Sequence, residues 1–289
     1  MFLKGNPGLI DYYETFASYL HDLCKLPIIG VSHTGHLNTS STNYKQSWNK
    51  IANLDQQVDD KIKYIENKLL QSNSDNVDII LIGHSIGCYI ILKMLTAIKE
   101  KNLNINVKKS ILIFPTIERM SRSPQGRVVT PVLNYLLRIL LLILLLVSFI
   151  PTKLLEKLVQ FYFSLRKNSS SVDKNVVKAS FYMISSYSCV KSLLLMAKHE
   201  MQVVNKLNFE DIRSHHKELI LYYGTNDHWC PLDYYHDMKQ NYENHLIDFN
   251  HSNSLLLDEN NLEHAFLIDL KQTETMSKLT AKWIKNSLE

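Results

Sequence analysis

One pentapeptide, Gly83-His84-Ser85-Ile86-Gly87, constrains the fold of this chain more than any other feature. It follows the apolar run Val77 to Ile82 and leads into the helical pattern Ile86 to Ile98. A serine at the apex of a sharp turn from a strand into a helix is held in a strained backbone, and side chains two residues away on either side would collide with the neighbouring backbone. Gly83 and Gly87 remove these collisions. The pattern therefore predicts a strand, a tight turn with Ser85 as a nucleophile, and a helix.

The rest of the chain alternates between strand-like and helix-like segments. Short apolar runs bounded by turn residues predict buried parallel strands at Pro27 to Val31, Val77 to Ile82, Ser110 to Phe114, Glu218 to Tyr223 and His245 to Phe249. Helical patterns occur at Tyr12 to Cys24, Leu54 to Leu70, Ile86 to Ile98, Leu232 to Asn241 and Thr273 to Ser287. This order predicts an α/β protein with a mostly parallel sheet and helices on both faces.

The chain is expected to form one domain with an insertion, because 289 residues fit the upper end of the single-domain range. The alternation stops between about Thr116 and Phe209, where helical or irregular sequence fills the gap. We therefore expect residues 1–115 and 210–289 to form the α/β core. Residues 116–209 would form a helical, strongly apolar cap above the carboxyl ends of the strands.

Composition excludes some functions and suggests a compartment. The net charge of +4 is too small to argue for nucleic acid binding. The four cysteines, Cys24, Cys88, Cys189 and Cys230, are widely scattered, which predicts free thiols in a reducing compartment. No signal peptide is visible in the first residues, so we expect the protein to face the cytosol.

The expected cap contains a long apolar segment, Val132 to Ile150. Its polar residues are Asn134, Arg138 and Ser148. The segment is nearly long enough to cross a bilayer, but an arginine in its middle would cost about 2.5–3.5 kcal/mol there. Thr130 and Pro131 suit the start of a helix and Pro151 its end, after which apolar residues continue. We therefore predict a kinked helical hairpin.

Basic residues flank this apolar segment on both sides. They are Arg119, Arg122 and Arg127 before it, and Lys153, Lys157, Arg166 and Lys167 after it. A spanning helix more often carries its basic residues on one side. Cations at both ends favour a segment, about residues 131–165, that dips into one leaflet or a monolayer. A buried core helix of the cap and a true transmembrane span remain alternatives.

A serine nucleophile requires a base within hydrogen-bond reach and an acid that orients the base. In hydrolases built on this type of turn, the chain order is serine, acid, histidine. Asp227 directly follows the strand Glu218 to Tyr223, and His264 lies between the last expected strand and the C-terminal helix. We predict Asp227 as the orienting acid and His264 as the general base, with His251 as the competing base. A turn at Asp227 and a surface or helix-capping role for His264 are the alternatives.

The negative charge that develops on a substrate carbonyl requires backbone donors. One typically comes from the residue after the nucleophile and one from a loop after an early strand. Ile86 is the first, and the turn Gly5-Asn6-Pro7-Gly8 offers the second. Because Pro7 has no N–H, the sequence predicts an oxyanion hole made by Asn6 and Ile86, with an ordinary turn as the alternative.

Other histidines and cysteines are expected to have structural roles. His33 and His36 have no carboxylate or cysteine at ligand spacing, so we expect them in a wall of the site and predict neither a metal nor another cofactor. His84 cannot easily act as the base, because neighbours in a sharp turn point apart. Cys88 and Cys230 are expected to pack in the core.

Six motifs in one order resemble the lipid droplet-associated hydrolase family. They are Gly5-Asn6-Pro7-Gly8, Gly83-His84-Ser85-Ile86-Gly87, Phe114-Pro115-Thr116-Ile117-Glu118-Arg119-Met120, Ser123-Pro124-Gln125-Gly126-Arg127, Tyr223-Gly224-Thr225-Asn226-Asp227-His228-Trp229-Cys230-Pro231 and His264-Ala265-Phe266. The resemblance covers nearly the whole chain, and the third, fourth and fifth motifs are more specific than the turn at Ser85. It implies an α/β-hydrolase fold and a triad of Ser85, Asp227 and His264. The implied reaction is hydrolysis of neutral-lipid esters, with cholesteryl esters as one candidate substrate, through an acyl-enzyme.

The resemblance also implies a location. The apolar insertion matches the segment associated with lipid droplets and the endoplasmic reticulum, so the expected partners are a droplet monolayer or that membrane, on its cytosolic face, and a neutral-lipid ester. Family members have early strands before the turn at Gly5, so we expect N-terminal strands to be absent from this chain. Two other functions stay open: a droplet-binding or organising protein with weak or no hydrolase activity, and an acyltransferase.

Overall fold

A parallel sheet forms the centre of the molecule. The structure is a computed structural model that describes residues 1–3, 5–36, 52–72, 77–166, 171–245 and 254–288. Within these residues the sheet has six strands in the order β2-β1-β3-β4-β5-β6, and all neighbours are parallel. The strands are β1 (Phe2–Leu3), β2 (Gly30–Val31), β3 (Val77–His84), β4 (Ile105–Ile113), β5 (Leu219–Tyr223) and β6 (Leu255–Leu257).

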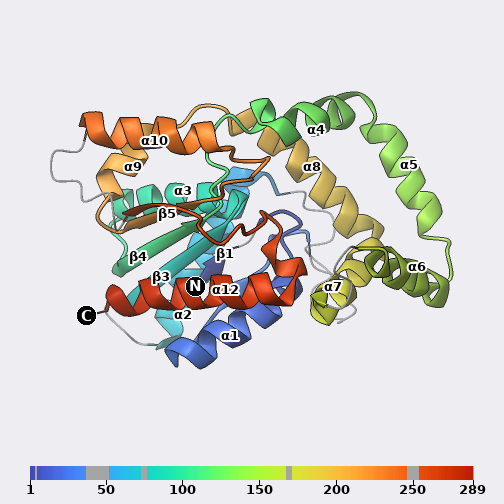
Figure 1. The fold of residues 1–289 in the computed structure, drawn as a ribbon, viewed down its shortest axis with the longest axis horizontal. Helices are drawn as coiled ribbons and strands as arrows, with labels where there is room; N and C mark the ends of the chain where they lie inside the picture. Colours follow the sequence, from blue (N-terminus) through green and yellow to red (C-terminus); the bar gives the residue numbers. More distant parts are fainter. Residues whose placement is uncertain (4, 37–51, 73–76, 167–170, 246–253, 289) are drawn as a thin grey trace.

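Helices cover both faces of the sheet (Figure 1). On one face α1 (Glu14–Cys24) packs against α12 (Leu270–Asn286). On the other face α3 (Ile86–Glu100) contacts α2 (Leu54–Ser72) and α9 (Phe209–His215), with α10 (Leu232–His245) on the same side. Short 3-10 helices are η1 (Ile10–Tyr13), η2 (Met120–Arg122) and η4 (Phe266–Ile268). The parallel α/β architecture predicted from the sequence is confirmed, and its apolar strands are buried because both faces are covered.

One predicted strand is shorter in the structure, and another lies almost entirely outside the described residues. Only Gly30–Val31 of the run Pro27 to Val31 pairs with a neighbour. The strand predicted at His245 to Phe249 lies almost entirely outside the described residues: its first residue, His245, is the last residue of α10, and residues 246–249 are not described. The last strand is β6, which pairs with β5. At three residues β6 is too short to show an alternating pattern, so the sequence did not reveal it.

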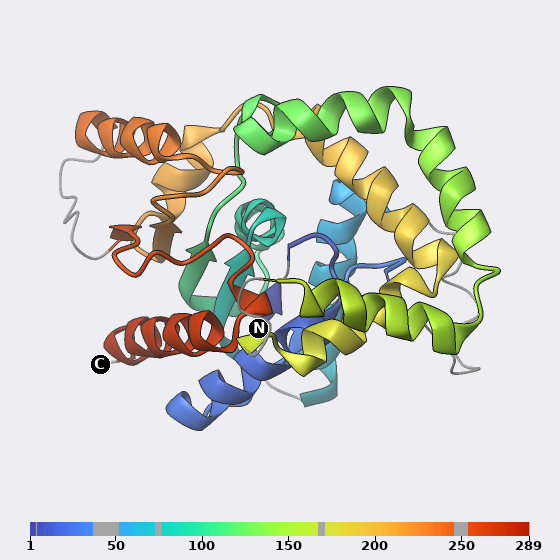
Figure 2. The same cartoon turned by 45° about the vertical axis from the view of Figure 1, so that its right-hand side comes forward.

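A helical insertion, which we define as residues 114–218, connects β4 to β5. Besides η2 and α9 it contains α4 (Pro124–Tyr135), α5 (Leu137–Val147), α6 (Thr152–Ser164), α7 (Lys174–Ile184) and α8 (Tyr187–Val203). Figure 2 shows α4, α5 and α6 as an arch that extends away from the sheet. The predicted helix start at Thr130 and Pro131 is wrong, because Ser123 caps the helix and Pro124 occupies its first turn. Pro131 lies inside α4.

The apolar segment is bent rather than continuous. The helices α4 and α5 meet at an angle of 80°. Among the described residues, no single helix has both the length and the apolar character needed to cross a membrane, whereas this bent pair meets the two criteria when its helices are taken together.

The cap of α4 leads to a stability prediction. The buried Ser123 hydroxyl accepts a hydrogen bond from the N–H of Gly126 at 3.0 Å and donates one to the carbonyl of Met120 at 2.9 Å. Ser123→Ala removes both bonds, so we expect the free energy of unfolding to fall by about 1–2 kcal/mol. Urea unfolding measures this loss. Ser148→Ala, which removes an exposed hydroxyl after α5, is the control, and an equal loss in both variants would contradict the prediction.

Candidate active site

Ser85 lies in a strained turn between β3 and α3. Its backbone has φ 55° and ψ −125°, a conformation that residues other than glycine rarely adopt. A Cβ atom on Gly83 would lie 3.0 Å from the backbone N of Cys88 and 3.0 Å from the carbonyl carbon of Gly87. Glycine at position 83 therefore permits the sharp return of the chain. The turn places the Ser85 hydroxyl at the start of α3, where the first N–H groups have no partner within the helix.

The structure brings the three predicted triad residues together. His264 Nε2 lies 2.9 Å from Ser85 Oγ, and His264 Nδ1 lies 2.6 Å from Asp227 Oδ2. Asp227 follows β5 and His264 follows β6, so the loops after three parallel strands meet at one edge of the sheet. This arrangement can activate a serine, since the histidine contacts both the nucleophile and an acid that orients it. The competing base, His251, lies outside the described residues.

Asp227 is buried but surrounded by donors. Its Oδ1 accepts hydrogen bonds from the N–H groups of Trp229 at 2.7 Å and Cys230 at 3.1 Å. Its Oδ2 accepts a bond from Cys230 Sγ at 3.0 Å in addition to the bond with His264. Burial raises the pKa of Asp227, but His264 and these donors outweigh it and lower the pKa to about 2. The carboxylate therefore stays ionised at neutral pH, as an orienting acid requires.

The same residues offer a poor metal site. Asp227, Cys230 and His264 place ligand-type atoms within 4.8 Å of one another. However, burial, followed by the charge of Asp227, raises the pKa of the Cys230 thiol well above its ordinary value. A neutral thiol is a weak ligand, because metals bind the thiolate. The hydrogen bonds of His264 to Ser85 and Asp227 also occupy both of its ring nitrogens.

The turn at Gly5 lies against the nucleophile. A Cβ atom on Gly5 would lie 2.8 Å from the Cβ of Ser85. The Asn6 side chain donates to Glu200 Oε1 at 3.0 Å and to the carbonyl of Leu193 at 3.3 Å, both on α8. Because that side chain is bound to α8, the backbone N–H is the donor that Asn6 can offer to a substrate. The oxyanion roles of Asn6 and Ile86 stay predictions.

His33 and His36 support the Gly5 turn from behind. The backbone N–H of His33 donates to the carbonyl of Gly8 at 2.9 Å, and His36 Nδ1 lies 2.7 Å from the carbonyl oxygen of Pro7. The two rings meet edge to face, with centroids 5.5 Å apart. These contacts hold the Gly5 turn against the loop that follows β2.

Sequence reasoning missed several residues that touch the candidate site. Phe114 has φ 50° and packs its ring 5.8 Å from that of His264. Tyr13 contacts His84. Glu200 is the only acidic residue of α8 and lies one helical turn after the buried Met196. An acidic residue on the apolar side of a helix is the sequence signal that could have identified Glu200.

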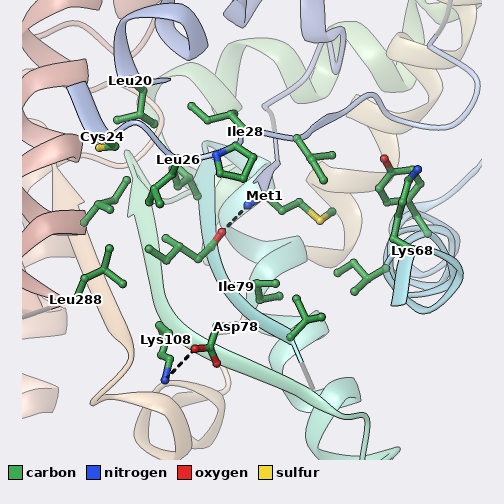
Figure 3. A pocket seen from close by; sticks show the side chains of 18 residues that line it. Met1, Leu20, Cys24, Leu26, Ile28, Lys68, Asp78, Ile79, Lys108 and Leu288 are labelled. Atoms are coloured by element: carbon green, nitrogen blue, oxygen red, sulfur yellow. Dashed lines mark hydrogen bonds and ion pairs between the residues drawn. The ribbon is translucent and has the colours of Figure 1, made fainter. Parts of the chain in front are cut away.

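An apolar cavity of about 490 Å³ lies away from this site, beside Met1 and the start of β3 (Figure 3). Its walls include Leu26, Ile28 and Ile79, and none of the triad residues lines it. The Met1 ammonium donates to the carbonyl of Ile80 at 2.5 Å, and burial lowers the pKa of this amine to about 6. The cavity therefore does not belong to the candidate active site.

Known proteins resemble this chain in sequence and in fold. The family model described as lipid-droplet associated hydrolase matches residues 1–267. A lipid droplet-associated hydrolase from Gallus gallus is 33% identical over 299 residues, which is 100% of this chain and 85% of that protein.

Two solved hydrolases share the fold. A meta-cleavage product hydrolase aligns with a TM-score of 0.57 at 14% identity, over 99% of this chain and 90% of its own. The peroxisomal α/β-hydrolase Lpx1 from Saccharomyces cerevisiae aligns with a TM-score of 0.54 at 15% identity, over 99% of this chain and 77% of its own. Such low identities show the fold alone, and the predicted α/β-hydrolase fold is confirmed.

Glu200 leads to a prediction about pH. Burial raises the pKa of this carboxyl from 4.5 to about 8. Between these values the unfolded chain has released the proton while the folded chain keeps it, so the free energy of unfolding falls as the pH rises. Glu200→Gln removes this proton linkage and keeps an acceptor for Asn6. We therefore expect the stability of the variant to fall less than that of the wild type from about pH 5 to about pH 8.

Urea unfolding of both proteins across this range measures the difference. A pKa shift of this size corresponds to a difference of a few kcal/mol between the two ends of the range. Parallel stability curves would contradict the prediction, because they would show that Glu200 is already ionised in the folded protein at the lower pH.

Proposed function

This chain belongs to the lipid-droplet associated hydrolase family, and we propose that it is a serine esterase acting on neutral-lipid esters at a lipid surface. The observation that carries the proposal is the hydrogen-bonded series Ser85, His264 and Asp227, with distances of 2.9 and 2.6 Å. The proposed substrates include cholesteryl esters. The proposed location is the lipid droplet and the endoplasmic reticulum, on the cytosolic face.

The proposed reaction proceeds through an acyl-enzyme. His264 Nε2 takes the proton from Ser85 Oγ as this oxygen attacks the ester carbonyl, and Asp227 stabilises the imidazolium that forms. The backbone N–H groups of Asn6 and Ile86 bind the oxyanion. His264 then gives its proton to the leaving alcohol. Water attacks the acyl-enzyme with His264 as base, which releases the carboxylic acid and restores Ser85.

A fluorophosphonate probe tests this proposal. The probe phosphonylates a serine that a base has activated, so we expect the wild type to be labelled and Ser85→Ala to be unlabelled. Asp227→Asn should react slower by several orders of magnitude, because the histidine loses its orientation and its correct tautomer. Ser148→Ala, which alters an exposed serine after α5, should label like the wild type. An unlabelled wild type, or equal labelling of Ser85→Ala, would refute the esterase.

The outer apolar surface of the insertion supports lipid contact. Its large exposed side chains are Tyr135, Leu136, Ile139, Leu142, Ile143, Leu145, Leu146, Phe149, Leu154, Leu158, Phe161, Tyr162 and Leu165. No residue of α5 is buried, which argues against a core helix of the cap. This many large exposed apolar side chains in neighbouring helices is typical of a membrane or partner contact. Lys153 and Lys157 on α6 are exposed and can extend toward lipid headgroups.

We therefore propose that residues of about 131–165 enter one leaflet or the droplet monolayer, and that residues 116–209 act as the cap. In this arrangement α5 lies in the lipid, while α8 contacts the turn at Asn6. Substrate dissolved in the lipid would then lie close to the cap, whose helix α8 contacts the turn beside Ser85.

Acidic substitutions in the outer apolar surface test this contact. Leu142, Leu146 and Phe149 are 57%, 61% and 77% exposed, so changing all three to Asp adds charge with little effect on packing. Each charge is costly in hydrocarbon, and we expect partition onto lipid droplets or phospholipid vesicles to fall roughly 100-fold or more. Flotation assays measure the bound fraction.

The control adds the same number of charges elsewhere. Asn102, Gln202 and Asn286 are exposed polar residues outside the outer apolar surface, and the triple change to Asp should leave flotation unchanged. Unchanged flotation of the variant at Leu142, Leu146 and Phe149 would refute the proposed contact.

A further inference from the structure

A buried series of hydrogen bonds joins the three segments that carry the candidate active site. The N–H of Gly5 donates to Tyr13 Oη at 3.1 Å, and Tyr13 Oη lies 2.6 Å from His84 Nδ1. On the other side of the ring, His84 Nε2 lies 2.9 Å from the backbone carbonyl oxygen of His264. Gly5 precedes Asn6, His84 precedes Ser85, and His264 is the predicted base. The series therefore connects the turn that carries Asn6, the turn that carries Ser85 and the loop that carries His264.

The direction of each bond follows from the partners. The carbonyl of His264 can only accept, so the neutral ring of His84 carries its hydrogen on Nε2. His84 Nδ1 is then the acceptor, and the Tyr13 hydroxyl donates to it while accepting from Gly5. Burial, followed by the charge of His264, lowers the pKa of His84 to about 3, which keeps the ring neutral. Each group in the series has one consistent role.

Packing holds the His84 ring in place. Its centroid lies 6.2 Å from that of Phe114 and 5.2 Å from that of Phe266, and both rings meet it nearly edge to face. Tyr13 and His84 are only 3% and 5% exposed. A Cβ atom on Gly5 would lie 2.8 Å from the Cβ of Ser85 and 3.3 Å from Nδ1 of His84, so Gly5 is fitted between these two residues. A shift of Tyr13 or His84 would therefore be transmitted to the turn and to the base.

Resting on the proposed esterase, we propose that Tyr13 and His84 are positioning residues that hold the Asn6 turn and the His264 loop in register with Ser85. Neither side chain hydrogen-bonds the Ser85 hydroxyl, so both act through Gly5 and through the backbone of His264. Their contribution is geometric. Small displacements of a base or of an oxyanion donor cost rate without changing how a substrate binds.

Removal of the Tyr13 hydroxyl tests the first link. Tyr13→Phe keeps the ring and removes the acceptor for Gly5 and the donor to His84. We expect the rate constant of fluorophosphonate labelling to fall roughly 10- to 100-fold. With a soluble short-chain ester, kcat should fall by a similar factor while KM stays unchanged. Tyr223→Phe is the matched control, because the Tyr223 hydroxyl is buried and has no hydrogen-bond partner among the described residues.

Two changes at His84 test the hydrogen bond between its ring and the carbonyl of His264. They are informative even if Tyr13→Phe does not fold. His84→Gln retains an amide N–H that can donate to the carbonyl of His264, whereas His84→Leu has no donor. We expect the glutamine variant to label several-fold faster than the leucine variant at a temperature where both are folded. A role in packing alone predicts equal rates for the two, because both replacements fill the space of the ring about equally well.

The outcomes separate this inference from the function on which it rests. A wild type that does not label would overturn the esterase, and the inference with it. A reactive wild type with unchanged kcat in Tyr13→Phe, or with equal rates in the two His84 variants, would overturn the inference and leave the esterase standing. A fall in kcat at constant KM, together with partial rescue by His84→Gln, supports it.

Discussion

The backbone of Ser85 is the constraint on which the rest of the site depends. A positive φ at a residue other than glycine costs free energy, and it persists only where the surroundings fix it. Here the N–H of Ser85 donates to the carbonyl of Ile113 at 3.0 Å, and the carbonyl of Ser85 accepts from Cys88 at 3.0 Å. These bonds fix the turn to β4 on one side and to α3 on the other. The hydroxyl is therefore held where the loops after β1, β5 and β6 converge.

Two buried carboxyl groups near this turn have pKa values shifted in opposite directions. Asp227 accepts hydrogen bonds from two backbone N–H groups, a thiol and His264, so its charge is stabilised although it is buried. Glu200 accepts one bond, from a neutral amide, and burial raises its pKa. The number and type of donors, more than depth, decides which acid is ionised. The difference in ionisation fits the contacts of the two acids. Asp227 hydrogen-bonds the predicted base His264, whereas Glu200 joins the Asn6 turn to α8.

Features carried by local sequence were predictable. The glycines around Ser85 and the apolar runs of β3, β4 and β5 predicted the turn and the central strands, and chain order pointed to Asp227 and His264. Contacts between distant residues were not predictable, because no spacing encodes them: Tyr13 meets His84 across 71 positions, and Asn6 meets Glu200 across 194. The short β6 and the start of α4 were missed because a three-residue strand has no period and a Ser-Pro pair upstream competed with Thr130-Pro131.

The helical insertion links the two halves of the proposed function. Helix α8 packs against α4 and α5, and α5 carries part of the outer apolar surface. The same α8 holds Asn6 through Glu200 and the carbonyl of Leu193, next to the nucleophile. Anchoring α5 in lipid would therefore fix the position of α8, and with it one side of the turn that faces Ser85. The Tyr13 and His84 series holds the other side from within the core. The turn is thus supported by α8, which packs against the helix proposed to enter the lipid, and by the Tyr13 and His84 series, which lies in the core.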